Sequence, residues 1–182
     1  MDVFAHGLWT GALYTYAQKK QKRPLKVGWA VFWGVIPDLF AFTPVFTWIF
    51  WQLVFNGSWY GNMDVRHMEP AMRDTIPIFR LTSDLYSISH SVIIFLAVLG
   101  AVLFLRRRIP WEIGGWLLHI FIDVPTHTYR FYPTPVLWPL FGWQFSGIAW
   151  STPWFMFVNY LAIALVYIAL KKYQESKKLS IA

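Results

Sequence analysis

Apolar residues in this chain gather in five segments, which are separated by basic or aromatic-rich connections. A run of about twenty apolar residues is long enough to cross a bilayer as an α-helix. The pattern predicts an all-α fold, a polytopic membrane helix bundle of about five transmembrane segments in a single integral-membrane domain over residues 1–182. The predicted segments are Val3–Gln18, Val27–Phe55, Leu85–Leu105, Trp111–Thr128 and Pro153–Leu170. The second segment is long enough to contain a break at Pro37 or Pro44.

The composition supports a membrane protein and limits the metal chemistry. Hydrophobic residues make up 57% of the chain and charged residues 14%, which is too apolar for an ordinary soluble domain. The start, Met1-Asp2-Val3, lacks a positive region, so we expect no cleavable signal peptide. The chain has no cysteine, which excludes disulfides and thiolate metal sites. Any metal ion must therefore be held by His and carboxylate ligands.

Basic residues cluster at three points beside the apolar segments, and this placement predicts the topology. The clusters are Lys19, Lys20, Lys22, Arg23 and Lys26; Arg106, Arg107 and Arg108; and Lys171, Lys172, Lys177 and Lys178. The positive-inside rule assigns all three to the cytoplasmic side, with the N-terminus outside and the C-terminus in the cytoplasm. In a bacterial host we expect the plasma membrane. Topology explains the net charge of +7, so no nucleic-acid partner is predicted.

Several His and Asp residues fall inside the apolar segments, where an ionisable group is costly and is a candidate functional residue. His119 and Asp123 are four residues apart and share one face of a helix. Counted from the predicted cytoplasmic ends, the group lies between about 12 and 24 Å along its helices, in the middle to outer half of the membrane. Its members are His6, Asp38, His90, His119, Asp123 and His127. Four predicted helices thus bring His or Asp to one depth, which favours a shared metal site.

The residue types in this group suit a divalent metal ion, with zinc favoured, and either one or two ions. The predicted metal ligands are His6, Asp38, His90, His119 and Asp123. Asp38 or Asp123, if not bound to metal, is a candidate general base, and His127 is a ligand or a proton carrier. Because His119 and His127 are about 12 Å apart along an unbroken helix, they share an ion only if Pro125 kinks the chain.

Simpler roles stay open for some of these residues. Asp38 follows Pro37 and could cap a helix that restarts after a break. Ser89 and Ser91 could orient His90 or bond to their own helix backbone. His67 lies in a polar connection and is expected to be a surface residue.

At these positions the chain resembles the YdjM-like membrane-bound metal-dependent hydrolases. The resemblance covers residues 6 to 139 and is carried by His6-Gly7, Pro37-Asp38, His90-Ser91, His119-x-x-x-Asp123-x-x-Thr126 and Pro135-Val136-Leu137-Trp138-Pro139. It implies an integral-membrane hydrolase whose metal is bound by these His and Asp residues. The family often has a second acidic residue and a His after Pro-Asp, where this chain has Leu39-Phe40. The order of ligands is also similar to that of zinc-dependent phospholipase C and related nucleases.

These observations predict a metal-dependent hydrolase that uses a metal-activated water on a lipid or lipid-linked ester, with a phosphodiester favoured. Arg80 and Arg130 lie where a phosphate headgroup could be met, or where arginine side chains reach the membrane interface. The sequence has no His-Glu-x-x-His and no Gly-x-Ser-x-Gly, so a thermolysin-type peptidase and a serine acyl-enzyme have no support. The alternatives are a non-catalytic metal or proton carrier, and a structural membrane protein with a buried His/Asp cluster.

Overall fold

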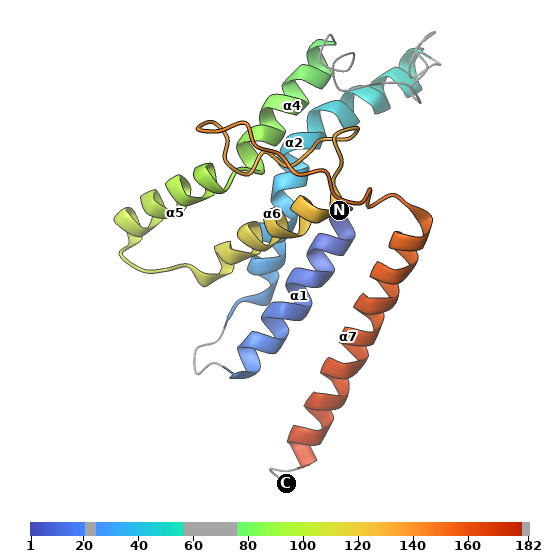
Figure 1. The fold of residues 1–182 in the computed structure, drawn as a ribbon. Coiled ribbons are helices and arrows are strands. Elements are labelled where there is room, and N and C mark those ends of the chain that lie inside the picture. Colours follow the sequence, from blue (N-terminus) through green and yellow to red (C-terminus); the bar gives the residue numbers. More distant parts are fainter. Residues whose placement is uncertain (21–24, 57–75, 180–182) are drawn as a thin grey trace.

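A computed structural model of the protein describes residues 1–20, 25–56 and 76–179. Over these residues the chain forms six α-helices and one short 3-10 turn (Figure 1). The helices are α1 (Val3–Lys20), α2 (Val27–Asn56), α4 (Pro77–Ser89), α5 (Val92–Arg106), α6 (Gly114–Thr126) and α7 (Pro153–Leu179), and the turn η2 (Trp111–Ile113) precedes α6. The predicted all-α fold is confirmed. His67 lies outside the described residues.

Two helices are long and apolar enough to cross a membrane, over Val27–Phe55 of α2 and Pro153–Ser176 of α7. A third candidate exists if α4 and α5, which are bent by 59° at the break between them, form one span. In the part of the chain that is described, α1 and α6 do not meet the same criterion. Helix α6 has only 13 residues, where about twenty are needed, and α1, with 18 residues, is not apolar enough. The five spans predicted from the sequence therefore reduce to two or three candidates.

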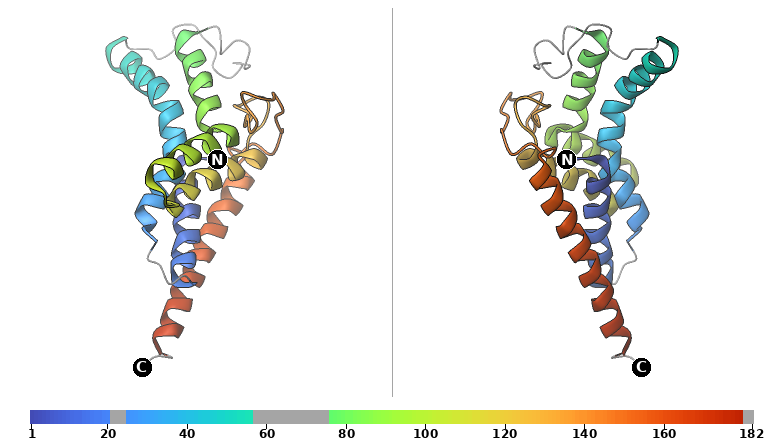
Figure 2. Two further views of the ribbon diagram at one scale, coloured as in Figure 1. Left: turned by 90° about the vertical axis from the view of Figure 1, so that its left-hand side faces the viewer. Right: turned by 90° about the vertical axis from the view of Figure 1, so that its right-hand side faces the viewer.

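The helices do not stand as a parallel bundle. Helices α1, α2 and α7 follow the long axis of the molecule, whereas α5 and α6 run across it (Figures 1 and 2). Helix α4 lies beside the C-terminal half of α2, where Trp48 and Phe79 make an edge contact at 6.1 Å between ring centroids. The connection from α6 to α7 lies over the start of α1, and Trp150 packs against the buried cluster of Met1, Ala5 and Ile163.

Small residues let α6 approach α2 at backbone distance. A Cβ atom placed on Gly115 would collide with the carbonyl oxygen of Ala30 and would lie 3.0 Å from the Gly34 nitrogen. Such contacts between small residues are a usual way for helices to associate in lipid, where burial of apolar surface gives no driving force. The contact places the His119 face of α6 directly against the middle of α2.

The break between α4 and α5 is fixed by Ser91. The Ser91 hydroxyl oxygen accepts hydrogen bonds from the backbone N–H groups of Ile93 and Ile94, at 3.1 and 3.3 Å, and so caps α5. The same hydroxyl donates to the carbonyl oxygen of Trp138. The Val92 N–H also donates to the Val136 carbonyl oxygen at 2.9 Å. These bonds hold His90, the last residue before the cap, at a fixed point in the interior.

Replacing Ser91 with alanine is expected to lower the free energy of unfolding by about 1–2 kcal/mol, because the helix cap is lost. The loss can be measured by titration with sodium dodecyl sulfate in detergent. Ser87→Ala, on the preceding helix, is the matched control, since the Ser87 side chain has no hydrogen bond to any described residue; its effect should stay within about 0.5 kcal/mol. Equal losses for the two variants would contradict the capping role.

Candidate metal centre

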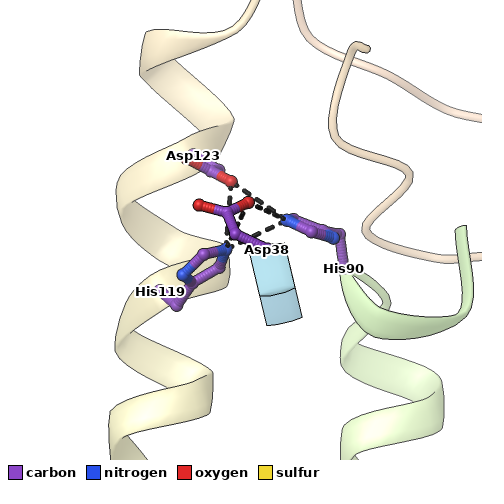
Figure 3. Close-up of side chains that lie close together, drawn as sticks. All are labelled: Asp38, His90, His119 and Asp123. Atoms are coloured by element: carbon purple, nitrogen blue, oxygen red, sulfur yellow. Dashed lines mark hydrogen bonds and ion pairs between the residues drawn. The ribbon is translucent and has the colours of Figure 1, made fainter. Parts of the chain in front are cut away.

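Four buried side chains from three parts of the fold converge on one point (Figure 3). Asp38 comes from the middle of α2, His90 from the break after α4, and His119 and Asp123 from successive turns of α6. One donor atom from each lies within 4.8 Å of the donor atoms of the other three. Among the described residues this is the one group of three or more His and acidic side chains with such spacing.

The donor atoms have the spacing that a metal ion requires. His90 Nε2 and His119 Nε2 are 2.9 Å apart, and each lies 3.3 Å from Asp123 Oδ2. Asp38 Oδ1 is 3.4 Å from His90 Nε2 and 3.6 Å from His119 Nε2. Donors placed about 2.0–2.1 Å from a tetrahedral ion lie roughly 3.3 Å from one another. The residues present therefore fit a single divalent ion.

The outer nitrogens of the two imidazoles explain why their Nε2 atoms face inward. His119 Nδ1 lies 2.8 Å from the Gly34 carbonyl oxygen, which can only accept, so Nδ1 carries the proton and the lone pair is on Nε2. His90 Nδ1 lies 3.1 Å from the Tyr86 carbonyl oxygen and 2.9 Å from the Ser89 hydroxyl. Backbone carbonyls commonly orient metal-binding histidines in this way. Two imidazole lone pairs thus point at each other and at carboxylate oxygens, which a cation between them stabilises.

Burial strengthens the case for a bound cation. His90, His119 and Asp123 have no exposed surface, and Asp38 is 3% exposed. Asp123 Oδ2 is buried and has no hydrogen-bond partner among the described residues. Two ionised carboxylates bring a charge of −2 into the interior, and a buried charge is costly unless it is paired. The Met1 α-amino group contacts Asp123 Oδ1 and supplies one positive charge, whereas a divalent ion would neutralise both carboxylates.

His6 and His127 lie on the other side of Asp123, outside the group of four. His6 Nε2 is 2.9 Å from Asp123 Oδ1 and 3.9 Å from Asp38 Oδ2, and its ring stacks on His119 at 3.7 Å. His127 Nε2 is 3.3 Å from Asp123 Oδ1. His127 Nδ1 lies 2.8 Å from the Tyr132 carbonyl oxygen. All six residues selected from the sequence are therefore in one cluster, with four facing one point and two flanking it.

The structure also tests the alternative, non-metal roles considered for Asp38, His127 and Ser89. Helix α2 continues through Pro37 and Pro44, so Asp38 is inside a helix and the reading of it as a cap is wrong. His127 has left α6 and adopts an extended conformation with φ −110° and ψ 154°. Ser89 bonds both to the Tyr86 carbonyl oxygen and to His90, which combines the two roles considered for it.

Some contributors to the cluster were not foreseen. The Tyr86 ring stacks on His90 at 3.7 Å between centroids, and its hydroxyl lies 3.3 Å from His127 Nδ1. Trp116 Nε1 donates to the Ser89 carbonyl oxygen at 2.6 Å and so ties α6 to the break beside His90. Tyr86 is four residues before His90, a helical spacing that could have indicated a shared face. The Gly34 carbonyl gives no signal in a sequence.

Comparisons of the chain with protein-family models, with curated proteins and with solved structures find no match.

Proposed function

We propose that this protein is an integral-membrane, metal-dependent hydrolase that acts on an ester of a lipid or lipid-linked substrate, with a phosphodiester favoured and zinc as the preferred ion. The convergence of Asp38, His90, His119 and Asp123 at metal-ligand spacing inside an apolar fold carries this proposal. Membership of the YdjM-like hydrolases, which the sequence motifs resemble, is included in the proposal. A divalent ion at this point would supply a Lewis acid and lower the pKa of a bound water.

Hydrolysis requires an open coordination position, which four protein ligands would deny to a tetrahedral ion. We assign ligation to His90, His119 and Asp123 and the general-base role to Asp38. Asp38 lies farther from both imidazole Nε2 atoms than Asp123 does, at 3.4 and 3.6 Å against 3.3 Å for each. Asp38 also lines a cavity that reaches the surface, as does His127.

These residues account for the proton movements of the reaction. Asp38 takes a proton from the attacking water, whose oxygen forms a bond to phosphorus. The bond from phosphorus to the leaving alcohol breaks, and a doubly protonated His127 gives the alcohol its Nε2 proton while its Nδ1 proton stays hydrogen-bonded to the Tyr132 carbonyl oxygen. The Tyr132 carbonyl oxygen holds the His127 ring with Nε2 toward the Met1 amino group, 2.9 Å away, and Asp123 Oδ1, 3.3 Å away. His6 packs on His119 and on Asp123 and acts as a positioning residue.

We place the protein in the membrane with the N-terminus outside and the C-terminus in the cytoplasm, in the plasma membrane of a bacterial host. Helices α2 and α7 provide the candidate spans. The bent pair α4 and α5 provides the third candidate span, and termini on opposite sides of the membrane require such an odd number of crossings. The large exposed side chains on the two long helices, such as Phe50, Leu53 and Leu165, suit contact with lipid.

A buried apolar layer next to the cluster argues against a carrier. A translocation path needs polar or hydrated access from both directions. On the α5 side of His119, the side chains of Phe95, Ile113, Trp116 and Ile120 form a buried hydrophobic core. The cavity reaches the cluster at Asp38 and His127, and none of these four core residues lines it. Access from one direction is what a hydrolase requires.

The proposal can be tested with zinc-loaded protein in detergent and bis(4-nitrophenyl) phosphate or an alkyl 4-nitrophenyl phosphate. Release of 4-nitrophenol is expected with the wild type, its loss after chelation, and its return when zinc is added. Asp38→Asn is expected to keep the ion and lose about 100-fold or more in kcat, the usual range for a general base. A protein that binds the ion and cleaves none of a panel of phosphate and carboxylic esters would overturn the proposal.

A further inference from the structure

An apolar cavity of about 440 Å³ lies beside the metal centre, between α1, α2, α4 and the connection that follows α6. Its volume is in the range of pockets that bind small molecules, about 300–1,000 Å³. The apolar part of its lining is built by the side chains of Phe42, Val45, Phe46, Ile49, Phe79 and Phe131. Nothing polar from α2 interrupts this wall beyond Asp38, among the residues that line the cavity.

The two ends of the cavity differ in chemistry. Asp38 and His127 line it at the metal centre, and both are buried, with exposed fractions of 3%. Arg130 also lines it, and its side chain is exposed and has no ion pair or hydrogen bond with any described residue. At the rim, Phe4 and Phe46 are 78% and 60% exposed. The cavity thus joins charged residues at the metal centre to an exposed, apolar rim.

We infer that this cavity binds the hydrocarbon chain of a phosphate-bearing membrane lipid, and that Arg130 binds the phosphate. The apolar wall suits a hydrocarbon chain, and the exposed Phe4 and Phe46 let the chain enter sideways from the bilayer. A guanidinium without a protein partner is suited to a phosphate group, which it can bind through two parallel hydrogen bonds. Arg80, the other arginine selected from the sequence, does not line the cavity.

This inference rests on the proposed function for its role in catalysis, because it brings the phosphorus atom of the substrate to Asp38 and His127. The binding itself does not depend on hydrolysis. A phosphate at the head of a hydrocarbon chain held in this cavity would meet Arg130, Asp38 and His127, which all line it. The hydrocarbon chain then makes a lipid phosphate bind more tightly than a free phosphate. Arg130 makes a phosphate ester bind more tightly than a carboxylic ester.

Binding of non-hydrolysable alkylphosphonates with methyl, butyl, hexyl and octyl chains tests the inference. The measurement is calorimetric, in detergent and with chelator present, so that the phosphonate cannot bind through a metal ion. Affinity is expected to rise up to about fourfold for each methylene that the cavity buries. Ile49→Phe, which narrows the cavity, should weaken octylphosphonate roughly tenfold and leave methylphosphonate unchanged.

Ile168→Phe is the matched control for the cavity, because Ile168 is 53% exposed on α7 and lines none of it. Since all variants share one detergent, partition of the chain into micelles cancels when variants are compared. Ile168→Phe is expected to bind the whole series as the wild type does. Equal chain-length dependence in the wild type, Ile49→Phe and Ile168→Phe would overturn the assignment of the cavity to the chain.

Arg130→Gln and its matched control, Arg80→Gln, test whether Arg130 binds the phosphate. Loss of a charge-assisted hydrogen bond to phosphate is expected to weaken every phosphonate roughly tenfold in Arg130→Gln, with no change in Arg80→Gln. The same weakening in both variants, or in neither, would overturn the role of Arg130. If phosphonates bind as expected while no ester is cleaved, the proposed function fails and the lipid-binding cavity stands. If esters are cleaved while phosphonate affinity does not depend on chain length, the proposed function stands and the lipid-binding cavity fails.

Discussion

His119→Ala is expected to remove the bound divalent ion and, with it, hydrolytic activity. His119 contributes one of the two closest donor nitrogens, 2.9 Å from His90 Nε2 and 3.3 Å from Asp123 Oδ2. Loss of a residue that merely orients a ligand costs 10–100-fold in metal affinity, and loss of the ligand itself is expected to cost more. Metal analysis of the purified protein should fall from about one ion per chain to near zero, which makes this the largest effect we expect.

Ile120→Ala is the matched control for His119→Ala. Ile120 is the next residue on α6 and has no exposed surface, so its truncation leaves a comparable hole in the interior. The free energy of unfolding should fall by about 2–5 kcal/mol, as for other large-to-small changes in a core. The variant should keep its metal. Equal metal content in His119→Ala and the wild type would contradict the metal centre, whereas metal loss in both variants would assign the effect to packing.

Zinc is expected to raise the free energy of unfolding by about 4 kcal/mol when its concentration is a thousand times its Kd. The physical reason is that the ion binds only where two carboxylates and two imidazole lone pairs meet, and the unfolded chain has no such site. Asp123→Asn keeps the shape of the side chain and removes its charge, so the stabilisation should nearly vanish. Unfolding by sodium dodecyl sulfate, with zinc and with chelator, measures the difference.

Asp84→Asn is the matched control for Asp123→Asn, because Asp84 is exposed on α4 and lies outside the cluster. It should be stabilised by zinc as strongly as the wild type. Zinc stabilisation that survives in Asp123→Asn would show that the ion binds elsewhere. Absence of stabilisation in the wild type would mean that the buried carboxylates are neutralised in another way, such as by the Met1 amino group that contacts Asp123.

The helical fold and the members of the cluster could be predicted from local patterns. The spacing of four residues between His119 and Asp123 predicts that they share a helix face, and their nearest donor atoms are 3.3 Å apart in the structure. An apolar segment tolerates an ionisable residue only with a compensating partner, so each His or Asp within such a segment was a candidate for the same site. This reasoning needs no knowledge of how the helices are arranged.

The arrangement itself could not be predicted, because the argument from helix rise assumed upright helices. Helices α5 and α6 run across the molecule instead (Figure 1), so distance along α6 is not depth in a bilayer. The break at His90 was also missed, since Ser89 and Ser91 can continue a helix as well as end one. What ends it is the contact of Ser91 with Trp138, a residue 47 positions away.

The number of spans was overestimated for a related reason. Trp111–Thr128 is apolar enough to suggest a span, yet its first three residues form a 3-10 turn and its helix ends at Thr126. Several of its apolar side chains contact other parts of the protein, since Ile113, Trp116 and Ile120 pack with Phe95 in a buried core. Hydropathy alone does not distinguish a helix that faces lipid from one that is buried in a fold.

The backbone contact at Gly115 and Ala30 has a consequence for membranes of different thickness. A long apolar helix such as α2, with 30 residues, responds to a thinner bilayer by tilting. Because no side chain separates α6 from α2 there, and because His119 is bonded to the Gly34 carbonyl oxygen, α6 must turn together with α2. Asp38, His119 and Asp123 then keep their mutual distances when α2 tilts, and Trp116, whose Nε1 donates to the Ser89 carbonyl oxygen, links His90 to the same unit.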